Sequence, residues 1–205
     1  MFRRISVVVV ILMVSGTTTA QAEDDDYARS GPYIGAAGTW AIWTQAEDEL
    51  EDEGLVSVDV ENPLGANGRA GYRINRHFAG EVQFEWLSES NIEASGLDIA
   101  GLDSWVLTAN AKGYILTLLM NDFGIARVQP FALVGVGMMQ SEIDDKVGLD
   151  ISDKDQSFAA RFGGGIDLYI TPNILGSVDV TYVLPGQDLY GLDYVSFGWG
   201  LQYRF

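Results

Sequence analysis

The chain has 205 residues, no cysteine, and 12 Lys plus Arg against 29 Asp plus Glu, which gives a formal net charge of −17. The lack of cysteine excludes disulfides, thiolate metal sites and cysteine nucleophiles. The strong acidity argues against a nucleic-acid partner, because phosphate backbones are bound by clusters of Lys and Arg.

The first residues have the features of a secretory signal peptide. Two arginines precede a mostly apolar run at residues 5–14, and Ala20-Gln21-Ala22 offers a small-x-small cleavage site. The run is too short to span a bilayer as a helix, which needs about 20 apolar residues. We therefore predict export, with a cleaved signal peptide at 1–22, an acidic segment at 23–30 and one domain at 31–205.

The remaining chain divides into segments of about ten residues with alternating apolar and polar side chains, the length and period of a tilted transmembrane strand. We expect eight strands, near residues 32–43, 64–74, 78–86, 104–115, 128–139, 157–170, 174–183 and 194–205. Three connections are expected to be turns, at 75–77, 117–127 and 171–173, and four to be long polar loops, at 44–63, 87–103, 140–156 and 184–193. Turns on one side and long loops on the other are typical of an outer-membrane barrel.

The last segment shows the alternation most clearly, with apolar residues at every odd position from 195 to 205, whereas the segments near 32–43 and 128–139 sort less cleanly. Isolated charges are costly away from water, so charged residues on the polar faces need partners. We predict that nine of them face a lumen and form an ion-pair network there: Arg69, Arg73, Glu81, Glu85, Lys112, Arg161, Asp167, Asp179 and Arg204.

A soluble lipocalin-type barrel has the same period with the faces inverted. The unequal connections and aromatic residues near the strand ends favour the membrane alternative, because such girdles mark the membrane interfaces. The loop-side girdle is expected at Trp43, Trp86, Trp105 and Tyr182, and the turn-side girdle at Tyr72, Phe78, Tyr203 and Phe205. The predicted fold class is therefore all-β, an eight-stranded antiparallel up-and-down transmembrane β-barrel.

Most of the acidic residues, 20 of the 29, lie in the four expected loops. Charged loops keep the outer rim hydrated, and divalent cation binding is the alternative, because carboxylate oxygens suit Ca²⁺ and Mg²⁺. The densest stretch lacks the spacing and the glycine of an EF-hand loop, so we assign no metal site and no cofactor. The weak metal candidates are Asp144, Asp145, Asp150, Asp153 and Asp155. Valines at 56, 58 and 60 alternate with polar residues, which predicts that the first hairpin projects beyond the membrane.

Residues for catalysis are sparse. The single histidine, His77, lies in an expected turn and is interpreted as a turn residue. The glycine-rich stretches 163–165 and 135–137 lack the Lys-Ser/Thr pair of a phosphate loop and are interpreted as structural. We predict that the protein is not an enzyme, with a lipid-modifying barrel enzyme that acts through Ser, Tyr or Glu as the alternative.

Three short motifs open the domain, end the second strand and close the chain: Gly31-Pro32-Tyr33-Ile34-Gly35, Gly71-Tyr72-Arg73 and Tyr203-Arg204-Phe205. With them, residues 31–205 resemble the small outer-membrane β-barrel family, which includes the transmembrane domain of outer-membrane protein A and its X and W relatives. The resemblance implies a Gram-negative outer membrane and contact with its lipid and lipopolysaccharide. It also implies biogenesis through periplasmic chaperones and the barrel-assembly machinery, with Tyr203 and Phe205 as the assembly signal. No peptidoglycan-binding domain is expected after Phe205.

The family determines fold much better than function. We predict a structural or surface-interaction role through the acidic loops, with an unidentified extracellular ligand, because eight strands enclose an interior that side chains just fill. The alternative is a narrow channel for ions or small solutes, since small inward residues leave volume in a lumen. These residues are Gly65, Gly71, Gly163, Gly165, Gly198 and Gly200.

Overall fold

The computed structural model describes residues 27–44, 58–60, 62–94, 97–114, 127–145, 153–186, 189 and 191–205. For residues 58–60, 89–94, 97–102, 142–145, 153 and 154 it describes the backbone alone. The predicted signal peptide, the acidic tract at 23–26, most of the expected turn at 117–127 and the middles of several expected loops lie outside these residues. Within the described ranges, no helix is long and apolar enough to cross a membrane. The strands are β1 (Gly31–Trp43), β2 (Val58–Val60), β3 (Leu64–Arg73), β4 (Phe78–Ala94), β5 (Leu97–Tyr114), β6 (Val128–Asp145), β7 (Asp153–Tyr169), β8 (Ile174–Pro185) and β9 (Tyr194–Arg204).

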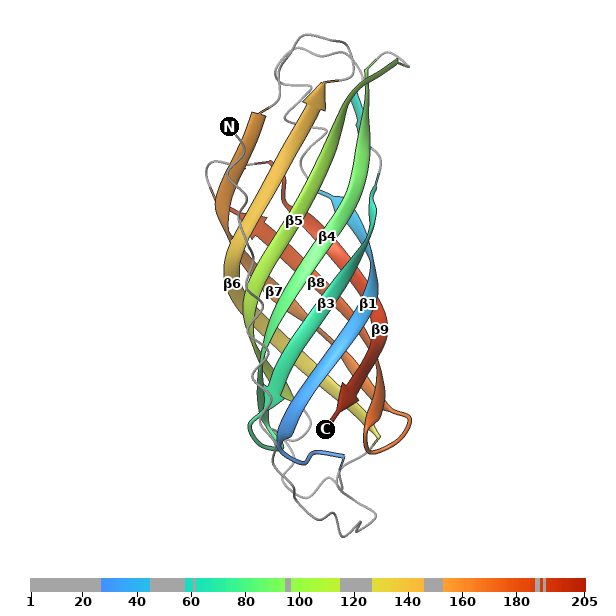
Figure 1. Cartoon of the computed structure of the whole chain (residues 1–205), viewed down its shortest axis with the longest axis vertical. Coiled ribbons are helices and arrows are strands. Elements are labelled where there is room, and N and C mark those ends of the chain that lie inside the picture. The colour runs from blue at the N-terminus through green and yellow to red at the C-terminus, as the bar shows by residue number, and fades with distance from the viewer. Residues whose placement is uncertain are drawn as a thin grey trace, which may run out of the picture.

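These strands form one closed antiparallel barrel (Figure 1). β1 pairs with β9 from Tyr33 opposite Arg204 to Trp43 opposite Tyr194, and the pairing of β4 with β5 completes the ring. β2 and β3 both pair with β4, β2 against residues 92–94 and β3 against residues 79–87, so they share one position in the wall. The wall therefore has eight positions, which confirms the predicted barrel.

Two of the expected turns are present and are set by local side-chain hydrogen bonds. Between β3 and β4, the side-chain oxygen of Asn75 accepts hydrogen bonds from the backbone N–H groups of His77 at 2.8 Å and Phe78 at 2.9 Å. Between β7 and β8, the hydroxyl of Thr171 accepts one from the N–H of Ile174 at 2.9 Å. Asn and Thr favour turns because their side chains replace a backbone partner in this way.

On the loop side the strands are longer than the sequence pattern predicted. Residues 87–94, 97–103, 140–145 and 153–156 were expected in loops, but they continue β4, β5, β6 and β7. Backbone pairing needs no lipid, so the ladder continues where the alternation of membrane strands has ended. The β4–β5 ladder shifts register twice there, between Leu87 and Ser90 and between Ile92 and Glu93. β2 pairs with β4 in the same region. Residues 45–57 lie outside the described part of the chain, so the projecting first hairpin stays a prediction.

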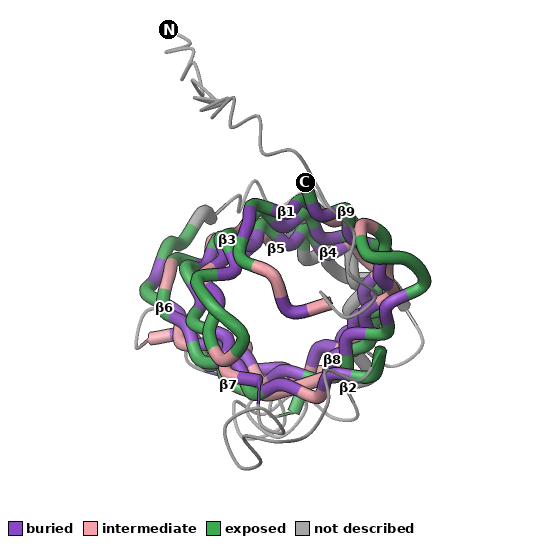
Figure 2. The backbone as a smooth tube through the Cα atoms, turned by 90° about the horizontal axis from the view of Figure 1, so that it is seen from below, coloured by how far each residue is buried: buried purple, intermediate pink, exposed green. Residues whose placement is uncertain are grey.

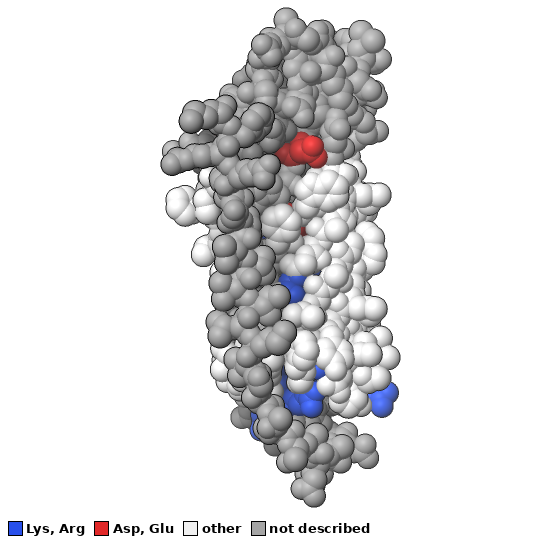
Figure 3. Space-filling model, viewed as in Figure 1, with Lys and Arg blue, Asp and Glu red and all other residues white. Residues whose placement is uncertain are grey.

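Buried and exposed residues alternate along the strands of the barrel wall, which Figure 2 shows as alternating colours of the backbone. The outer surface carries the large exposed apolar residues, for example Phe84, Val134 and Val180, and the described residues on the face in Figure 3 are mostly uncharged. In β1 and β6, whose apolar and polar residues did not alternate clearly in the sequence, buried and exposed positions alternate as well. Their pattern was obscured because Ala and Gly occupy both faces of β1 and because Phe131, Leu133 and Met139 of β6 are apolar but point inward.

The aromatic girdles agree with the prediction except at Trp43. This residue points into the barrel, where its ring lies edge-on to Tyr194 with centroids 5.3 Å apart. Trp40 is the tryptophan of β1 that lies on the outer surface, where its ring packs against that of Phe197 with centroids 5.6 Å apart. Trp43 was misassigned because proximity to a strand end does not determine the face, whereas the parity of its position does.

Inward glycines make room for long side chains rather than for an open lumen. A Cβ on Gly71 would lie 2.4 Å from the ring of Tyr33, and one on Gly198 would lie 2.7 Å from the carboxylate of Asp179. At Gly135, the amide oxygen of Asn110 would lie only 1.9 Å from such a Cβ. The side chains of neighbouring strands therefore fill the space that these glycines provide, which removes the main argument for a channel.

A matched pair of substitutions on β3 tests this packing. Gly71→Ala is expected to lower the free energy of unfolding by about 1–3 kcal/mol, because the added methyl group overlaps Tyr33 and the carbonyl of Gly80. Gly68→Ala is the control, because a Cβ there meets nothing within 4 Å on the outer surface. Denaturant unfolding of the refolded barrel in lipid vesicles measures both variants. Equal stabilities would contradict a tightly packed interior.

Candidate functional site

The most distinctive feature of the interior is a column of charged side chains that bond across the barrel. On the loop side, Arg161 of β7 forms a two-fold contact with Glu85 of β4, with nitrogen–oxygen distances of 3.1 and 3.2 Å. The hydroxyls of Tyr194 and Ser196 donate to the same carboxylate, at 2.7 and 3.2 Å. Both ion-pair partners are completely buried. Since β5 and β6 lie between β4 and β7 in the wall, this contact ties together non-adjacent strands.

The next level of the column joins β3 to β8. Arg69 donates to Asp179 at 3.0 Å and to the amide oxygen of Asn67 at 2.9 Å. Asn67 in turn donates to the hydroxyl of Thr39 on β1, at 2.8 Å. All four side chains are buried, so the charge of Arg69 is compensated within the protein.

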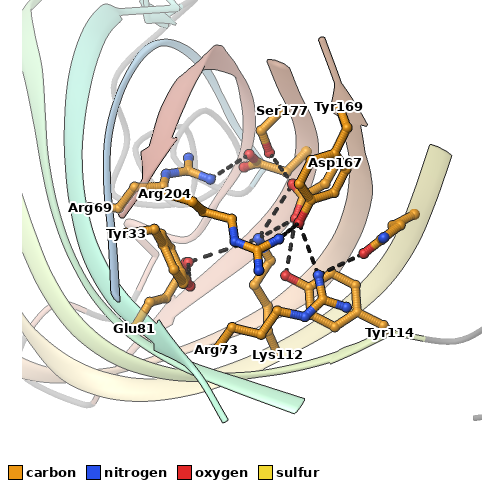
Figure 4. A network of polar contacts seen from close by, with 12 residues as sticks. Tyr33, Arg69, Arg73, Glu81, Lys112, Tyr114, Asp167, Tyr169, Ser177 and Arg204 are labelled. Carbon is orange, nitrogen blue, oxygen red and sulfur yellow. Dashed lines mark hydrogen bonds and ion pairs between the residues drawn. The ribbon is translucent and has the colours of Figure 1, made fainter. Parts of the chain in front are cut away.

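A larger cluster surrounds Lys112, as Figure 4 shows. Lys112 lies opposite Ala79 at the start of β4, so this cluster is closer to the turns. The ammonium of Lys112 lies 3.2 Å from Asp167 and 3.9 Å from Glu81. Asp167 also accepts hydrogen bonds from the hydroxyls of Ser177, at 2.9 Å, and Tyr114, at 3.2 Å. One fully buried cation thus serves two carboxylates, and hydroxyls satisfy further lone pairs of Asp167.

Aromatic side chains complete this cluster. The hydroxyl of Tyr33 donates to Glu81 at 2.8 Å, and the ammonium of Lys112 lies 3.8 Å from the ring centroid of Phe131. A cation over an aromatic face is stabilised by the ring quadrupole, especially when it is desolvated. Phe131 is an inward apolar residue of β6 that the alternation pattern alone did not assign a role.

Arg73 and Arg204 differ from the other three cations. In the described part of the chain they bond to neutral oxygens rather than to carboxylates. Arg73 donates to Gln129 at 2.7 Å, to the hydroxyl of Tyr169 at 3.0 Å and to the backbone carbonyl of Arg76 at 2.8 Å. Arg204 donates to the same Tyr169 hydroxyl at 2.7 Å. The sequence predicted ion pairs for both residues, but it did not account for the carbonyl oxygens that the chain brings to the turn-side end.

Above the charged column, towards the loops, the interior becomes apolar. Buried side chains from β1, β4, β5, β6, β7, β8 and β9 form one cluster with Leu189 there, and Leu192 packs against this cluster. The buried members are Ala41, Leu87, Val106, Met139, Ala159, Val183, Leu189 and Tyr194. This apolar layer lies inside the barrel at its loop-side end.

The structure brings all nine predicted lumen charges into the interior, where each is at most 5% exposed. Among the metal candidates, Asp155 is exposed, and the side chains of the other four are outside the described part of the chain. Within the described residues, no group of three acidic or His side chains is placed so that it could hold a metal ion. His77 lies in the β3–β4 turn, and Tyr203 and Phe205 lie on the outer surface with rings 5.1 Å apart. The assembly role of these two aromatics stays a prediction.

Sequence reasoning missed the tyrosine hydroxyls that complete the network. Tyr33, Tyr114, Tyr169 and Tyr194 all point inward and bond to charged residues. Tyr114 and Tyr169 share the strand faces of the predicted lumen residues Lys112 and Asp167, but a tyrosine there is equally well explained as a packing residue. The parity of Tyr194, opposite to that of the apolar face of β9, was the signal that could have identified it.

The loop-side ion pair can be tested with a double substitution. Arg161→Leu is expected to lower the free energy of unfolding by about 3–5 kcal/mol, because it leaves the Glu85 carboxylate buried without its cation. Arg161→Leu combined with Glu85→Leu should recover most of this loss, since neither charge then remains. Denaturant unfolding in lipid vesicles measures both variants. A double variant no more stable than the single one would contradict a dominant charge-pair effect.

Comparisons with known proteins give the same fold. The family model for the outer membrane protein beta-barrel domain matches residues 7–205, and a search of curated proteins finds no match. Neisserial surface protein A superimposes with a TM-score of 0.61 at 14% identity, covering 86% of this chain and 99% of that one. The attachment invasion locus protein Ail of Yersinia pestis has a TM-score of 0.52 at 19% identity, covering 86% of this chain and 97% of that one. The outer membrane protein OprG of Pseudomonas aeruginosa has a TM-score of 0.54 at 12% identity, covering 87% of this chain and 94% of that one. At these identities the likeness concerns the fold alone.

Proposed function

This chain belongs to the outer-membrane β-barrel family, and on that basis we propose that it is a non-conducting wall protein whose protruding loop-side sheet contacts partners outside the cell. The signal peptide predicted at residues 1–22 delivers it across the inner membrane. The apolar outer surface and its aromatic girdles then lie in outer-membrane lipid and lipopolysaccharide, with the long loops facing outward.

The extension of β4–β7 past the loop-side girdle carries this proposal. Trp86 and Trp105 face each other across β4 and β5 on the outer surface, and beyond them β4 continues to Ala94 while β5 begins at Leu97. Eight residues of extended strand span roughly 25 Å along the chain. Among the described strands, β8 ends at Pro185 and β1 at Trp43, so the described residues of the raised part form an open sheet rather than a closed barrel (Figure 1).

An open sheet has edges, and the part of β7 before Phe158 is such an edge among the described strands. β8 pairs with β7 only from Ala159 onwards, and the carbonyl of Phe158 accepts a hydrogen bond from the N–H of Gly186 at 2.7 Å. Backbone groups alternate in direction along a strand, so those of Lys154 and Gln156 point to the same side as those of Phe158. No described strand pairs with them there. Such an edge binds an extended polypeptide by strand addition.

The charge of this region indicates the chemistry of the partner. Asp155 is exposed on the edge strand, and acidic residues at 142, 144, 145, 150 and 153 surround it in the sequence. A basic extended polypeptide therefore complements both the backbone and the charge of the edge. Ail, a structural neighbour with the same fold, is by name an attachment protein, which is consistent with a role in surface contact.

A proline substitution tests the edge. We expect refolded protein in nanodiscs of zwitterionic lipid to bind an immobilised peptide of alternating lysine and threonine, and Gln156→Pro to weaken this binding at least tenfold by removing an edge N–H. Gln156→Ala retains the N–H group and should bind within twofold of the unchanged protein. A peptide of alternating glutamate and threonine is the charge control. Equal losses in the two variants, or no binding at all, would rule out strand addition at this edge.

Conductance distinguishes the wall protein from the narrow channel. The channel alternative gains some support from buried polar atoms without a described partner, namely the side chains of Thr108 and Asn110 and one oxygen of Glu81. Against it stand the filled charged column and the apolar layer above it. We expect the refolded protein, verified by heat-modifiable gel mobility, to be silent in a planar bilayer. Discrete and reproducible openings would favour the channel instead.

A further inference from the structure

Residues 27–30, which precede β1, run across the turn-side opening of the barrel. Figure 2 shows this segment entering the ring from the β1 side and ending near its centre. Ala28 is only 6% exposed, and the hydroxyl of Ser30 donates to the backbone carbonyl of Ile74 at 2.8 Å. The segment is therefore packed against the barrel rather than extended into solvent.

Side chains of the barrel wall hold this segment by its backbone. Arg204 donates to the carbonyl of Tyr27 at 2.6 Å and also to the carbonyl of Arg29. Gln129 of β6 donates to the Tyr27 carbonyl at 3.4 Å. The wall residues thus contact the segment from two widely separated strands, β9 and β6.

The side chain of Tyr27 is held as well. Its ring packs on that of Tyr169 with centroids 5.4 Å apart, and the guanidinium of Arg127 lies 5.6 Å from its ring centroid. Tyr169 is also the shared acceptor of Arg73 and Arg204. The segment, the two arginines and this tyrosine therefore form one connected layer across the opening.

We propose that residues 27–30 form a strap that seals the turn-side end of the lumen, with Arg204 as its anchor. The strap answers an electrostatic need. Arg73 and Arg204 are buried and share one hydroxyl, so their like charges require other acceptors. The β3–β4 turn supplies carbonyls to Arg73, and the strap supplies carbonyls to Arg204. Removing the strap leaves Arg204 without two of its acceptors and opens the layer to the periplasm.

The strap also secures the junction between the first and last strands. Arg204 lies on β9, and the strap leads directly into β1, its partner strand. The N–H of Phe205 donates to the carbonyl of Pro32 at 3.1 Å at the same end. A guanidinium that reaches from the last strand to the chain before the first strand therefore reinforces the closure from inside.

Thiol labelling tests the seal, because the chain has no cysteine of its own. Leu175→Cys places a reporter on β8 at a position that is 2% exposed and directly opposite Tyr169 in the ladder. In nanodiscs, we expect a small anionic methanethiosulfonate to react with this thiol slowly. Adding Arg204→Gln or Tyr27→Ala should accelerate the reaction at least tenfold. Arg204→Lys should be intermediate, since one ammonium replaces the two-fold contact poorly.

The control is Tyr72→Ala, which removes an aromatic side chain at the same end but from the outer surface. It should leave the labelling rate within twofold of that of Leu175→Cys alone. Heat-modifiable mobility verifies the barrel in every variant, and Tyr27→Ala still decides the matter if Arg204→Gln fails to fold. The seal is overturned if the thiol reacts as fast with the intact strap as without it, or if Tyr72→Ala accelerates labelling equally.

Discussion

The barrel depends on one constraint, which is that every backbone polar group inside lipid must bond to a neighbouring strand. A closed antiparallel wall is the all-β solution, and β1 against β9 provides the closure. Closure fixes the alternation of side chains between lipid and interior at every position. The interior of an eight-position barrel is then narrow enough that its side chains must either pair or pack, and both occur in this protein.

The same constraint explains what the sequence could predict. Period and apolar composition located the strands within the membrane and assigned Arg69, Arg161 and Asp179 to the interior, because a charge on the lipid face is strongly unfavourable. The ends of β4–β7 could not be predicted, because ladder pairing above the membrane leaves no apolar alternation in the sequence. Trp43 was misplaced for a related reason, since an aromatic residue is acceptable on either face near a strand end.

The partners of the charged residues were beyond sequence reasoning for a different physical reason. The alternation of side chains along β3 indicates that Arg73 points inward, but it does not indicate which acceptor Arg73 contacts across the lumen. The structure gives Arg73 and Arg204 carbonyls and a shared tyrosine hydroxyl, while it gives Arg161 a carboxylate. The difference follows from position. Arg161 lies deep in the wall, where backbone carbonyls are already paired in the ladder, whereas the two other arginines lie where turns and the preceding chain leave carbonyls free.

The hydrogen-bond acceptors of the inward arginines thus change from carboxylates deep in the barrel to backbone carbonyls at the turn side, and the two ends of the barrel differ accordingly. At the turn side, carbonyls outside the ladder converge on arginines, so the end is held inward and closed. At the loop side, an apolar layer containing Leu189 lies in the interior, and the described parts of β4–β7 continue beyond the ends of β1 and β8. Neither lipid nor lumen constrains the residues above that layer, which is the physical reason why the proposed strand addition is placed there. A filled interior and a projecting open sheet are therefore complementary consequences of the same small barrel.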